Sequence, residues 1–129
     1  MRQTKFRAIS KSTGDWVYGD LVHKRTEPDT VLIQDEQGVG HDADPQTVGQ
    51  FTGMLDADGR EIYEGDVIHS DNNSHTILFD DRYGAFRAFW GKNGEQSCFL
   101  YPDWITEFHK TVTGNIHQKT KKKNIQQNK

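Results

Sequence analysis

The chain has 129 residues, enough for one small domain or for two subdomains that share a core. Hydrophobic residues make up only 33% of it and aromatic residues 11%, so we expect a small core rich in aromatic side chains. The net charge of −3 argues against bulk attraction to nucleic acid, and no apolar run is long enough to span a membrane.

The N-terminal region reads as a series of short β-strands. Residues 5–9 and 16–22 flank the polar turn 10–15, which predicts a hairpin, and residues 31–34 predict a third strand. Asp44 followed by Pro45 is typical of a helix start, but the glycines that follow limit this helix to one or two turns. We therefore expect residues 1–47 to form an N-terminal β subdomain.

Residues 48–66 predict a turn-rich connector between two sets of strands. Asp58-Gly59 is a strong hairpin-turn dipeptide, and Glu64-Gly65-Asp66 places a second turn directly before an apolar pair. Glycine adopts positive φ at little cost, so the glycines are expected to be structural. The residues to which we assign structural turn roles are Gly49, Gly53, Asp58, Gly59, Glu64, Gly65 and Asp66, with Gly114 later in the chain.

The C-terminal half predicts a small SH3-like β-barrel over residues 62–117. Regularly spaced turns separate five expected strands, and no run suggests a long helix. The apolar run 76–79 predicts burial on both faces, and residues 103–109 suit either one helical turn or an irregular strand. The predicted strands are residues 66–70, 75–80, 85–90, 97–101 and 111–117, the last with Val112 and Ile116 pointing inward. The predicted fold class is therefore mainly β, or at most α+β.

No constellation of residues predicts catalysis, a metal or a cofactor. The acids between Asp56 and Asp66 do not match a calcium loop, because with Asp56 as the first position Gly59 is the fourth rather than the sixth, and the twelfth is Val67. His69 and His75 lack a third ligand nearby and are interpreted as exposed strand-end histidines. Cys98, the single cysteine, lies in an apolar run and is interpreted as a buried, inert thiol, as expected in a reducing cytoplasm.

The last twelve residues, 118–129, are expected to form a disordered basic tail. Residues 119–129 hold five of the 16 basic residues and no acid, which leaves 11 against 19 acids, or −8, for the rest of the chain. A solubilising end is the favoured interpretation, and weak binding of phosphates is the alternative. That alternative would use the tail lysines Lys119, Lys121, Lys122 and Lys123.

The central stretch resembles the YopX family of phage and prophage proteins. Residues 44–53, DPQTVGQFTG, are similar to its DPxTVGQ-aromatic-TG segment, and residues 58–68, DGREIYEGDVI, to its GKEI-aromatic-EGD segment. The segments 5–8 and 113–117 are similar to the family's KFRAW start and IGNIYE end, with Ile9 in place of tryptophan and His117 in place of tyrosine. The resemblance covers residues 4–117. It implies a β-rich fold with an SH3-like C-terminal part and assigns no catalytic residue.

Three hypotheses about function follow. The first is a non-catalytic phage or prophage accessory protein in the bacterial cytoplasm, which acts through protein–protein contacts and forms a homo-oligomer, because there is more aromatic surface than one small core can hide. The second is a weak nucleic-acid-binding module that uses a barrel face and the lysine tail. The third is a small metal-assisted hydrolase that uses the acidic central loop. We rank it last, because the spacing of the acids in that loop does not match a metal site.

Overall fold

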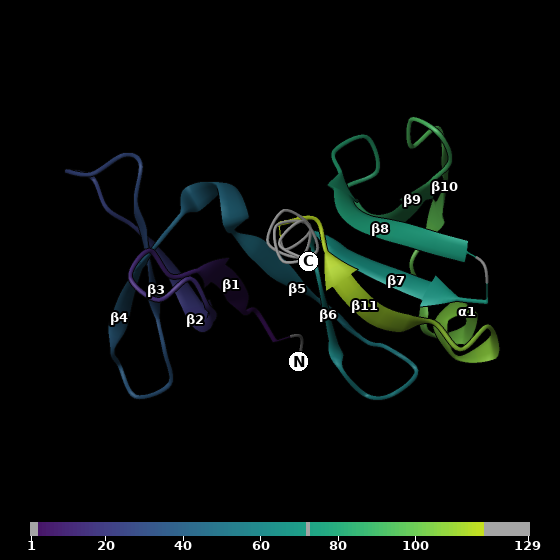
Figure 1. The fold of residues 1–129 in the computed structure, drawn as a ribbon, viewed down its shortest axis with the longest axis horizontal. Coiled ribbons are helices and arrows are strands. Elements are labelled where there is room, and N and C mark those ends of the chain that lie inside the picture. The colour runs from purple at the N-terminus through teal and green to yellow at the C-terminus, as the bar shows by residue number, and fades with distance from the viewer. Residues whose placement is uncertain (1–2, 72, 118–129) are drawn as a thin grey trace, which may run out of the picture. The chain divides into compact units, whose positions relative to one another are not determined.

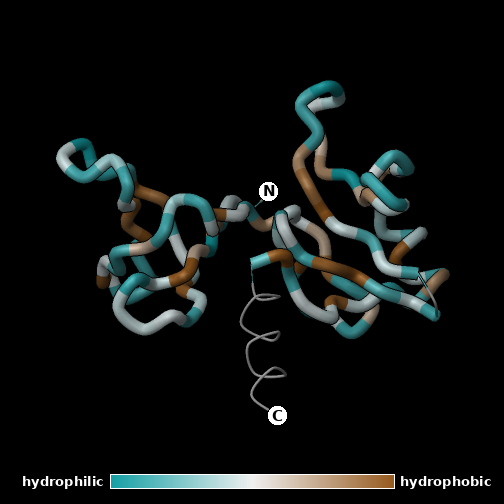
Figure 2. Tube along the Cα trace, turned by 45° about the horizontal axis from the view of Figure 1, so that its top comes forward, coloured by the Kyte–Doolittle hydropathy of each residue, from teal (hydrophilic) through white to brown (hydrophobic). Residues whose placement is uncertain are grey.

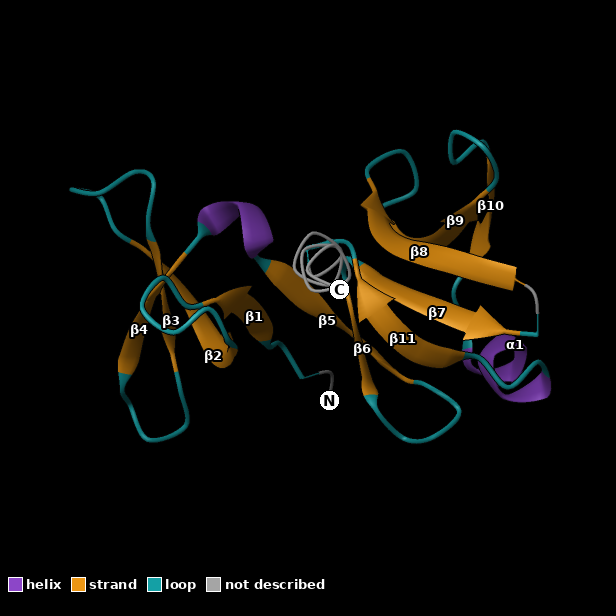
Figure 3. Cartoon of the chain, viewed as in Figure 1, coloured by secondary structure: helices purple, strands orange, loops and turns teal. Residues whose placement is uncertain are grey.

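The computed structural model describes residues 3–71 and 73–117. These residues form two compact units that divide between Gly53 and Met54. The described chain contains strands in two antiparallel sheets, a 3₁₀ helix and a short α-helix (Figures 1 and 3). The predicted mainly β fold class is therefore confirmed.

The first unit is a sheet of short antiparallel strands. The sheet has the order β4-β3-β2-β1-β5-β6, in which β6 belongs to the second unit, and the first four strands follow one another as a meander. Ala8, Val31, Ile33 and Ala43 are almost fully buried and form its core. The four strands are β1 (Phe6–Ile9), β2 (Trp16–His23), β3 (Val31–Gln34) and β4 (Gly40–Ala43).

The 3₁₀ helix η1 (Pro45–Thr47) follows β4. Asp44 caps it, since its carboxylate accepts a hydrogen bond from the Gln46 N–H at 2.9 Å. Proline stands at its first position, where no backbone donor is needed. The helix start predicted from Asp44-Pro45 is thus confirmed.

The predicted connector contains two strands. β5 (Gly49–Leu55) pairs with β1 and crosses the boundary between the units, and β6 (Glu61–Tyr63) follows it in the sheet. Gly49 and Phe51 are buried in β5, while Gly53 has φ +86°. The glycines concealed this strand because they break the alternation of side chains on which a strand prediction depends.

The second unit has the strand order of a small SH3-like barrel. Its sheet runs β10-β9-β8-β7-β11. The last strand in the chain, β11, pairs with the first strand of this sheet in the chain, β7. Its core consists of Ile62, Ile68, Ile77, Ala88, Leu100 and Ile105. In each unit the hydrophilic residues gather at the loop tips (Figure 2). The elements of this sheet and its helix are β7 (Asp66–Ser70), β8 (Asn73–Asp80), β9 (Ala85–Trp90), β10 (Gln96–Phe99), α1 (Pro102–Glu107) and β11 (Thr111–Asn115).

The prediction that the run 76–79 is buried on both faces was wrong. Ile77 is fully buried, but Leu78 is 37% exposed and Phe79 43% exposed. The expected inward position of Ile116 was also wrong, because β11 ends at Asn115 and Ile116 is 39% exposed. An apolar run alone does not reveal whether the second face of a sheet is covered.

Candidate functional site

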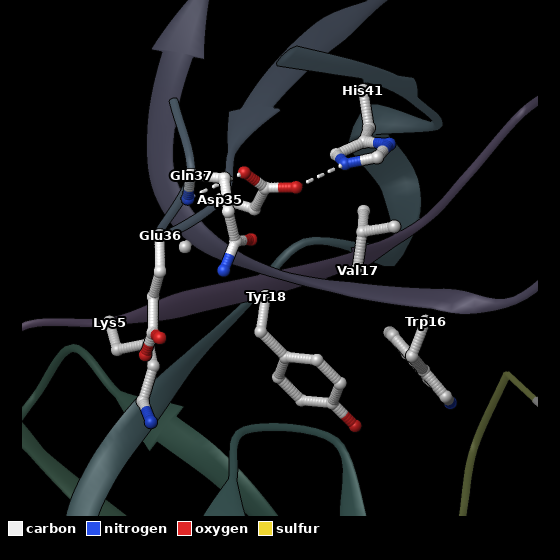
Figure 4. A pocket seen from close by; sticks show the side chains of 9 residues that line it. Lys5, Trp16, Val17, Tyr18, Asp35, Glu36, Gln37 and His41 are labelled. Atoms are coloured by element: carbon white, nitrogen blue, oxygen red, sulfur yellow. Dashed lines mark hydrogen bonds and ion pairs between the residues drawn. The ribbon is translucent and has the colours of Figure 1, made fainter. Parts of the chain in front are cut away.

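The first unit contains a cavity of about 330 Å³ beside β2 (Figure 4). Trp16 and Tyr18 lie on one side of it, and Asp35 and His41 lie on the other (Figure 4). The guanidinium carbon of Arg7 lies 4.1 Å from the centre of the Trp16 ring. The cavity is lined by Lys5, Trp16, Val17, Tyr18, Gly19, Asp35, Glu36, Gln37 and His41.

Asp35 holds together the turn that borders this cavity. One carboxylate oxygen accepts the N–H groups of Gln37 and Val39 at 3.0 and 2.9 Å, and the other lies 2.8 Å from His41 Nε2. The hydrogen bond from His41, followed by that from Val39, holds the pKa of Asp35 below its ordinary value despite burial. The residues lining the cavity include no serine, threonine or cysteine, and the phenol of Tyr18 is the one side-chain hydroxyl among them.

The second unit contains a cavity of about 250 Å³ that we call the tryptophan cavity. It is lined by Asn73, His75, Trp90, Trp104, Phe108 and Lys110. The His75 ring packs edge-on against both tryptophans, with ring centres 4.8 Å from Trp90 and 5.1 Å from Trp104. β8, the end of β9, α1 and the α1–β11 connection thus meet at this cavity.

The end of α1 places Lys110 at this cavity. His109 adopts the left-handed conformation, with φ +48°, and the Lys110 N–H donates to the Ile105 carbonyl at 2.9 Å. This pattern is a helix C-terminal motif that turns the chain sharply. The Lys110 ammonium then lies 5.0 Å from the Trp104 ring centre and 6.0 Å from that of Phe108.

Both titratable groups of the tryptophan cavity are deeply buried. His75 is 6% exposed and Lys110 is 4% exposed. Burial, reinforced by the Lys110 charge, lowers the pKa of His75 to about 4, so His75 is neutral at pH 7. Burial also lowers the pKa of Lys110. The interpretation of His75 as an exposed strand-end histidine was therefore wrong.

The opposite face of the same sheet carries exposed apolar side chains, which we call the outer aromatic face. Leu78 and Phe99 stand directly across from Arg87 on neighbouring strands, so all three point to one side of the sheet. Leu78, Phe99 and Tyr83 are 37%, 46% and 57% exposed. The guanidinium carbon of Arg87 lies 4.4 Å from the ring centres of both Tyr83 and Phe99.

Arg87 is buried beneath this face and is paired with an acid. Its Nη1 lies 3.3 Å from an Asp80 carboxylate oxygen, and Arg82 contacts the same oxygen at 3.1 Å. The hydrogen bond from Arg82 holds the pKa of Asp80 below its ordinary value, against the effect of burial. The outer aromatic face therefore lies above a cluster of two guanidinium groups that share one carboxylate, and this cluster keeps a net positive charge.

Asp56 organises the central segment, where sequence reasoning predicted a turn or capping role for it but no contact with a distant strand. Its carboxylate accepts the N–H groups of Asp58, Arg60 and Val112 at 2.8–2.9 Å. Burial opposes ionisation, but these three donors outweigh it and hold the pKa of Asp56 below its ordinary value. Asp56 thus fastens the turn 56–60 to β11, a contact between residues 56 positions apart that no local pattern reveals.

The residues to which we assigned turn roles lie in this segment and in β11. Gly59 and Gly65 have φ of +87° and +92°, and the buried carboxylate of Asp66 accepts the Tyr63 N–H at 2.8 Å. Asp58 is 50% exposed at its side chain and contacts Arg60. Gly49 and Gly53 lie in β5, Glu64 and Gly65 join β6 to β7, and Gly114 follows a register shift in β11.

The remaining sequence candidates lie apart from these features. His69 donates to or accepts from the Ser74 hydroxyl at 2.8 Å and stands opposite Ser74 rather than His75. Cys98 is half-buried against the second core, and burial raises the pKa of its thiol. Residues 3–71 and 73–117 hold no group of three histidine, cysteine or acidic residues placed to bind a metal. The lysines Lys119, Lys121, Lys122 and Lys123 lie outside the described residues.

Comparison with solved structures identifies a similar fold. The crystal structure of protein EF1440 from Enterococcus faecalis superposes with a TM-score of 0.60 and 19% sequence identity, over 93% of this chain and 97% of that one. At this identity the likeness concerns the fold. Within the described residues, neither helix is long and apolar enough to cross a membrane.

Comparison of the sequence with protein families gives the lineage. No curated protein is similar enough to this chain to count as a match. The family model described as YopX protein matches residues 5–122, nearly the whole chain, and includes the central segments 44–53 and 58–68. The chain therefore belongs to the YopX protein family.

Proposed function

We propose that this protein is a non-catalytic phage or prophage accessory protein that acts through protein–protein contacts in the bacterial cytoplasm, and that its first contact is with a second copy of itself. The outer aromatic face carries this proposal. Leu78 and Phe99 flank Arg87 on one face of the sheet, and the exposed Tyr83 ring contacts Phe99 with 5.2 Å between the ring centres. Contiguous exposed apolar side chains on a small protein mark an interaction surface.

The edge of the sheet beside this face supports pairing with a second copy. β10 (sequence QSCF) is an edge strand that contains no charge and no proline, the two features with which proteins commonly protect such edges. The other edge strands are protected: β4 contains Asp42, β6 contains Glu61, and β11 has a register shift. Two β10 strands can pair antiparallel about a two-fold axis, since an antiparallel pair of identical strands is self-complementary.

The charges of this face favour a protein partner over nucleic acid. Arg87 is buried and shares the Asp80 carboxylate with Arg82, so it is not available as a cation for phosphates. The aromatic rings stack on Arg87 rather than standing apart from it. A non-catalytic role is supported by the first cavity, where the Asp35 carboxylate is engaged in a turn and no serine, threonine or cysteine is among the lining residues.

Light scattering coupled to size-exclusion chromatography tests the proposal. We expect the wild-type chain to elute as a dimer or larger assembly and Ser97→Lys to elute as a monomer. Ser97 stands opposite Phe89 on the outer face of β10, so the lysine adds a charge to the edge while the fold keeps its core. Val39→Lys is the matched control: it places the same charge on an exposed apolar residue of the first unit and should leave the assembly unchanged.

A wild-type chain that stays monomeric at high concentration would contradict self-association through this face. An assembly that Ser97→Lys and Val39→Lys disrupt equally would show that general surface hydrophobicity, and not the β10 edge, holds the copies together. Circular dichroism of both variants confirms that each is folded before the masses are compared.

A further inference from the structure

The tryptophan cavity holds a buried cation without a paired acid. Lys110 is 4% exposed, and within the described residues its ammonium forms no ion pair with a carboxylate, although the Asp71 charge acts on it from beyond ion-pair distance. Its contacts are instead the faces of Trp104 and Phe108. Since a buried charge is costly unless an opposite charge accompanies it, this ammonium is a site at which an anion would be stabilised.

A second polar atom of the cavity also lacks a partner. The Nδ1 atom of His75 is buried and has no hydrogen-bond partner in the described part of the chain. Buried polar atoms of side chains are nearly always hydrogen-bonded, so the Nδ1 atom of His75 is an exception. Because His75 is neutral, its imidazole offers one N–H donor and one acceptor without adding charge.

The walls of the cavity favour a flat apolar body. Trp90 and Trp104 both pack edge-on against His75, and Phe108, which also lines the cavity, is 53% exposed. A volume of about 250 Å³ holds one aromatic ring or two fused rings, since a cavity of roughly 150 Å³ already holds benzene. The same aromatic side chains stabilise a planar ring by edge-to-face or offset contact.

We propose that the tryptophan cavity binds a small aromatic carboxylate. The carboxylate pairs with the Lys110 ammonium, and the ring lies against Trp90, Trp104 and Phe108. The neutral His75 imidazole forms part of the wall of the same cavity. This site belongs to the inner side of the second sheet and does not depend on self-association through the outer aromatic face.

Titration calorimetry and tryptophan fluorescence test the site with defined probes. Benzoate and indole-3-carboxylate are the two ligands, benzamide is the ring without the charge, and cyclohexanecarboxylate is the charge without the aromatic ring. We expect both aromatic carboxylates to bind saturably, with dissociation constants of about 1 mM or lower, and to quench tryptophan fluorescence. We expect each control compound to bind more weakly than the aromatic carboxylates, by a factor of about ten at least.

Lys110→Met is the decisive variant, because methionine keeps the length and apolar stem of the lysine and removes its charge. It should bind benzoate about tenfold more weakly and lose the preference for benzoate over benzamide. Lys92→Met, at an exposed lysine in the β9–β10 loop, is the matched control and should bind as the wild type does.

A measurement on the unaltered chain covers the case in which Lys110→Met does not fold. Paired with a carboxylate, Lys110 must show a higher pKa, which NMR detects at its ε-carbon during a pH titration with and without benzoate. The absence of saturable binding, equal binding by Lys110→Met and the wild type, or an unchanged Lys110 pKa with benzoate bound would each overturn the proposal.

Discussion

Asp56 shows how one buried carboxylate can hold two distant segments together. Its oxygens accept three backbone N–H groups, one of them from β11. In Asp56→Asn an amide NH₂ replaces one acceptor and faces backbone donors, so we expect a loss of about 2 kcal/mol in the free energy of unfolding. Urea denaturation at pH 7 measures this loss.

Asp58→Asn is the control for this prediction, because the Asp58 side chain is 50% exposed and its substitution should cost less than about 0.5 kcal/mol. The depressed pKa of Asp56 gives a further signature: its stabilisation is complete above its ordinary pKa and is lost as the pH falls through the folded-state pKa. Equal stability losses in the two variants would contradict the role assigned to Asp56.

His75 predicts a second dependence of stability on pH. Its pKa falls from 6.5 to about 4 on folding, so below pH 6.5 the unfolded chain binds a proton that the folded chain does not. Stability should be complete above pH 6.5 and should decline between pH 6.5 and 4, by up to about 3 kcal/mol. Denaturant melts across this pH range measure the decline.

The variant His75→Phe should remove most of this decline, since phenylalanine fills a similar space between the tryptophans and does not titrate. His23→Gln, at an exposed position at the end of β2, should keep it. If the wild type and His75→Phe lose stability in parallel, another group is responsible for the pH dependence.

Side-chain burial was the least predictable property at the scale of single residues. The sequence suggested that His75 is exposed because it borders a polar turn, whereas the strand register turns it inward beside Ile77. Nothing near Lys110 in sequence indicates that its ammonium lies against Trp104. Each of these environments is assembled from separate elements, so local composition does not encode it.

At the scale of elements, the turn between β6 and β7 depends on Gly65. Its φ is +92°, its N–H donates to the Ile77 carbonyl at 2.6 Å, and its carbonyl accepts the Ile116 N–H at 2.9 Å. A Cβ at this position would meet only ordinary contacts, the nearest at 3.7 Å, so the strain of a substitution comes from the backbone.

We therefore expect Gly65→Val to cost about 1–3 kcal/mol of stability, and Gly65→Asn to cost less because asparagine tolerates positive φ better than a β-branched residue. Thermal melts of the two variants compare these costs. A Gly65→Val melt at or above that of Gly65→Asn would contradict a conformational requirement for glycine here.

The elements that sequence reasoning recovered are those with strong local signals. β2, β3 and β9 carry dense β-forming residues or clear alternation, and η1 has a capping aspartate and a proline. β4, with the sequence GHDA, is polar and was not predicted as a strand. It forms a strand because it pairs antiparallel with β3, and such pairing overrides the low intrinsic strand propensity of its residues.

At the scale of the whole molecule, the apolar residues are divided between two small cores. Small units bury a lower fraction of their surface than large ones, so aromatic side chains remain exposed. The spacing of turns predicted the mainly β class, and the long central motif predicted the family. The outer aromatic face could not be predicted, because it depends on which side of β8 and β10 remains uncovered.

Hydrogen exchange of the β10 amides tests the proposed self-association most directly. If second copies pair through this edge, exchange of the amides in residues 96–99 should slow as the protein concentration rises, because the pairing occupies groups that are otherwise free at the edge of the sheet. The β4 edge, which carries Asp42, should exchange at a rate independent of concentration, as should β10 in Ser97→Lys. Exchange at β10 that does not change with concentration in the wild-type chain would contradict the proposal.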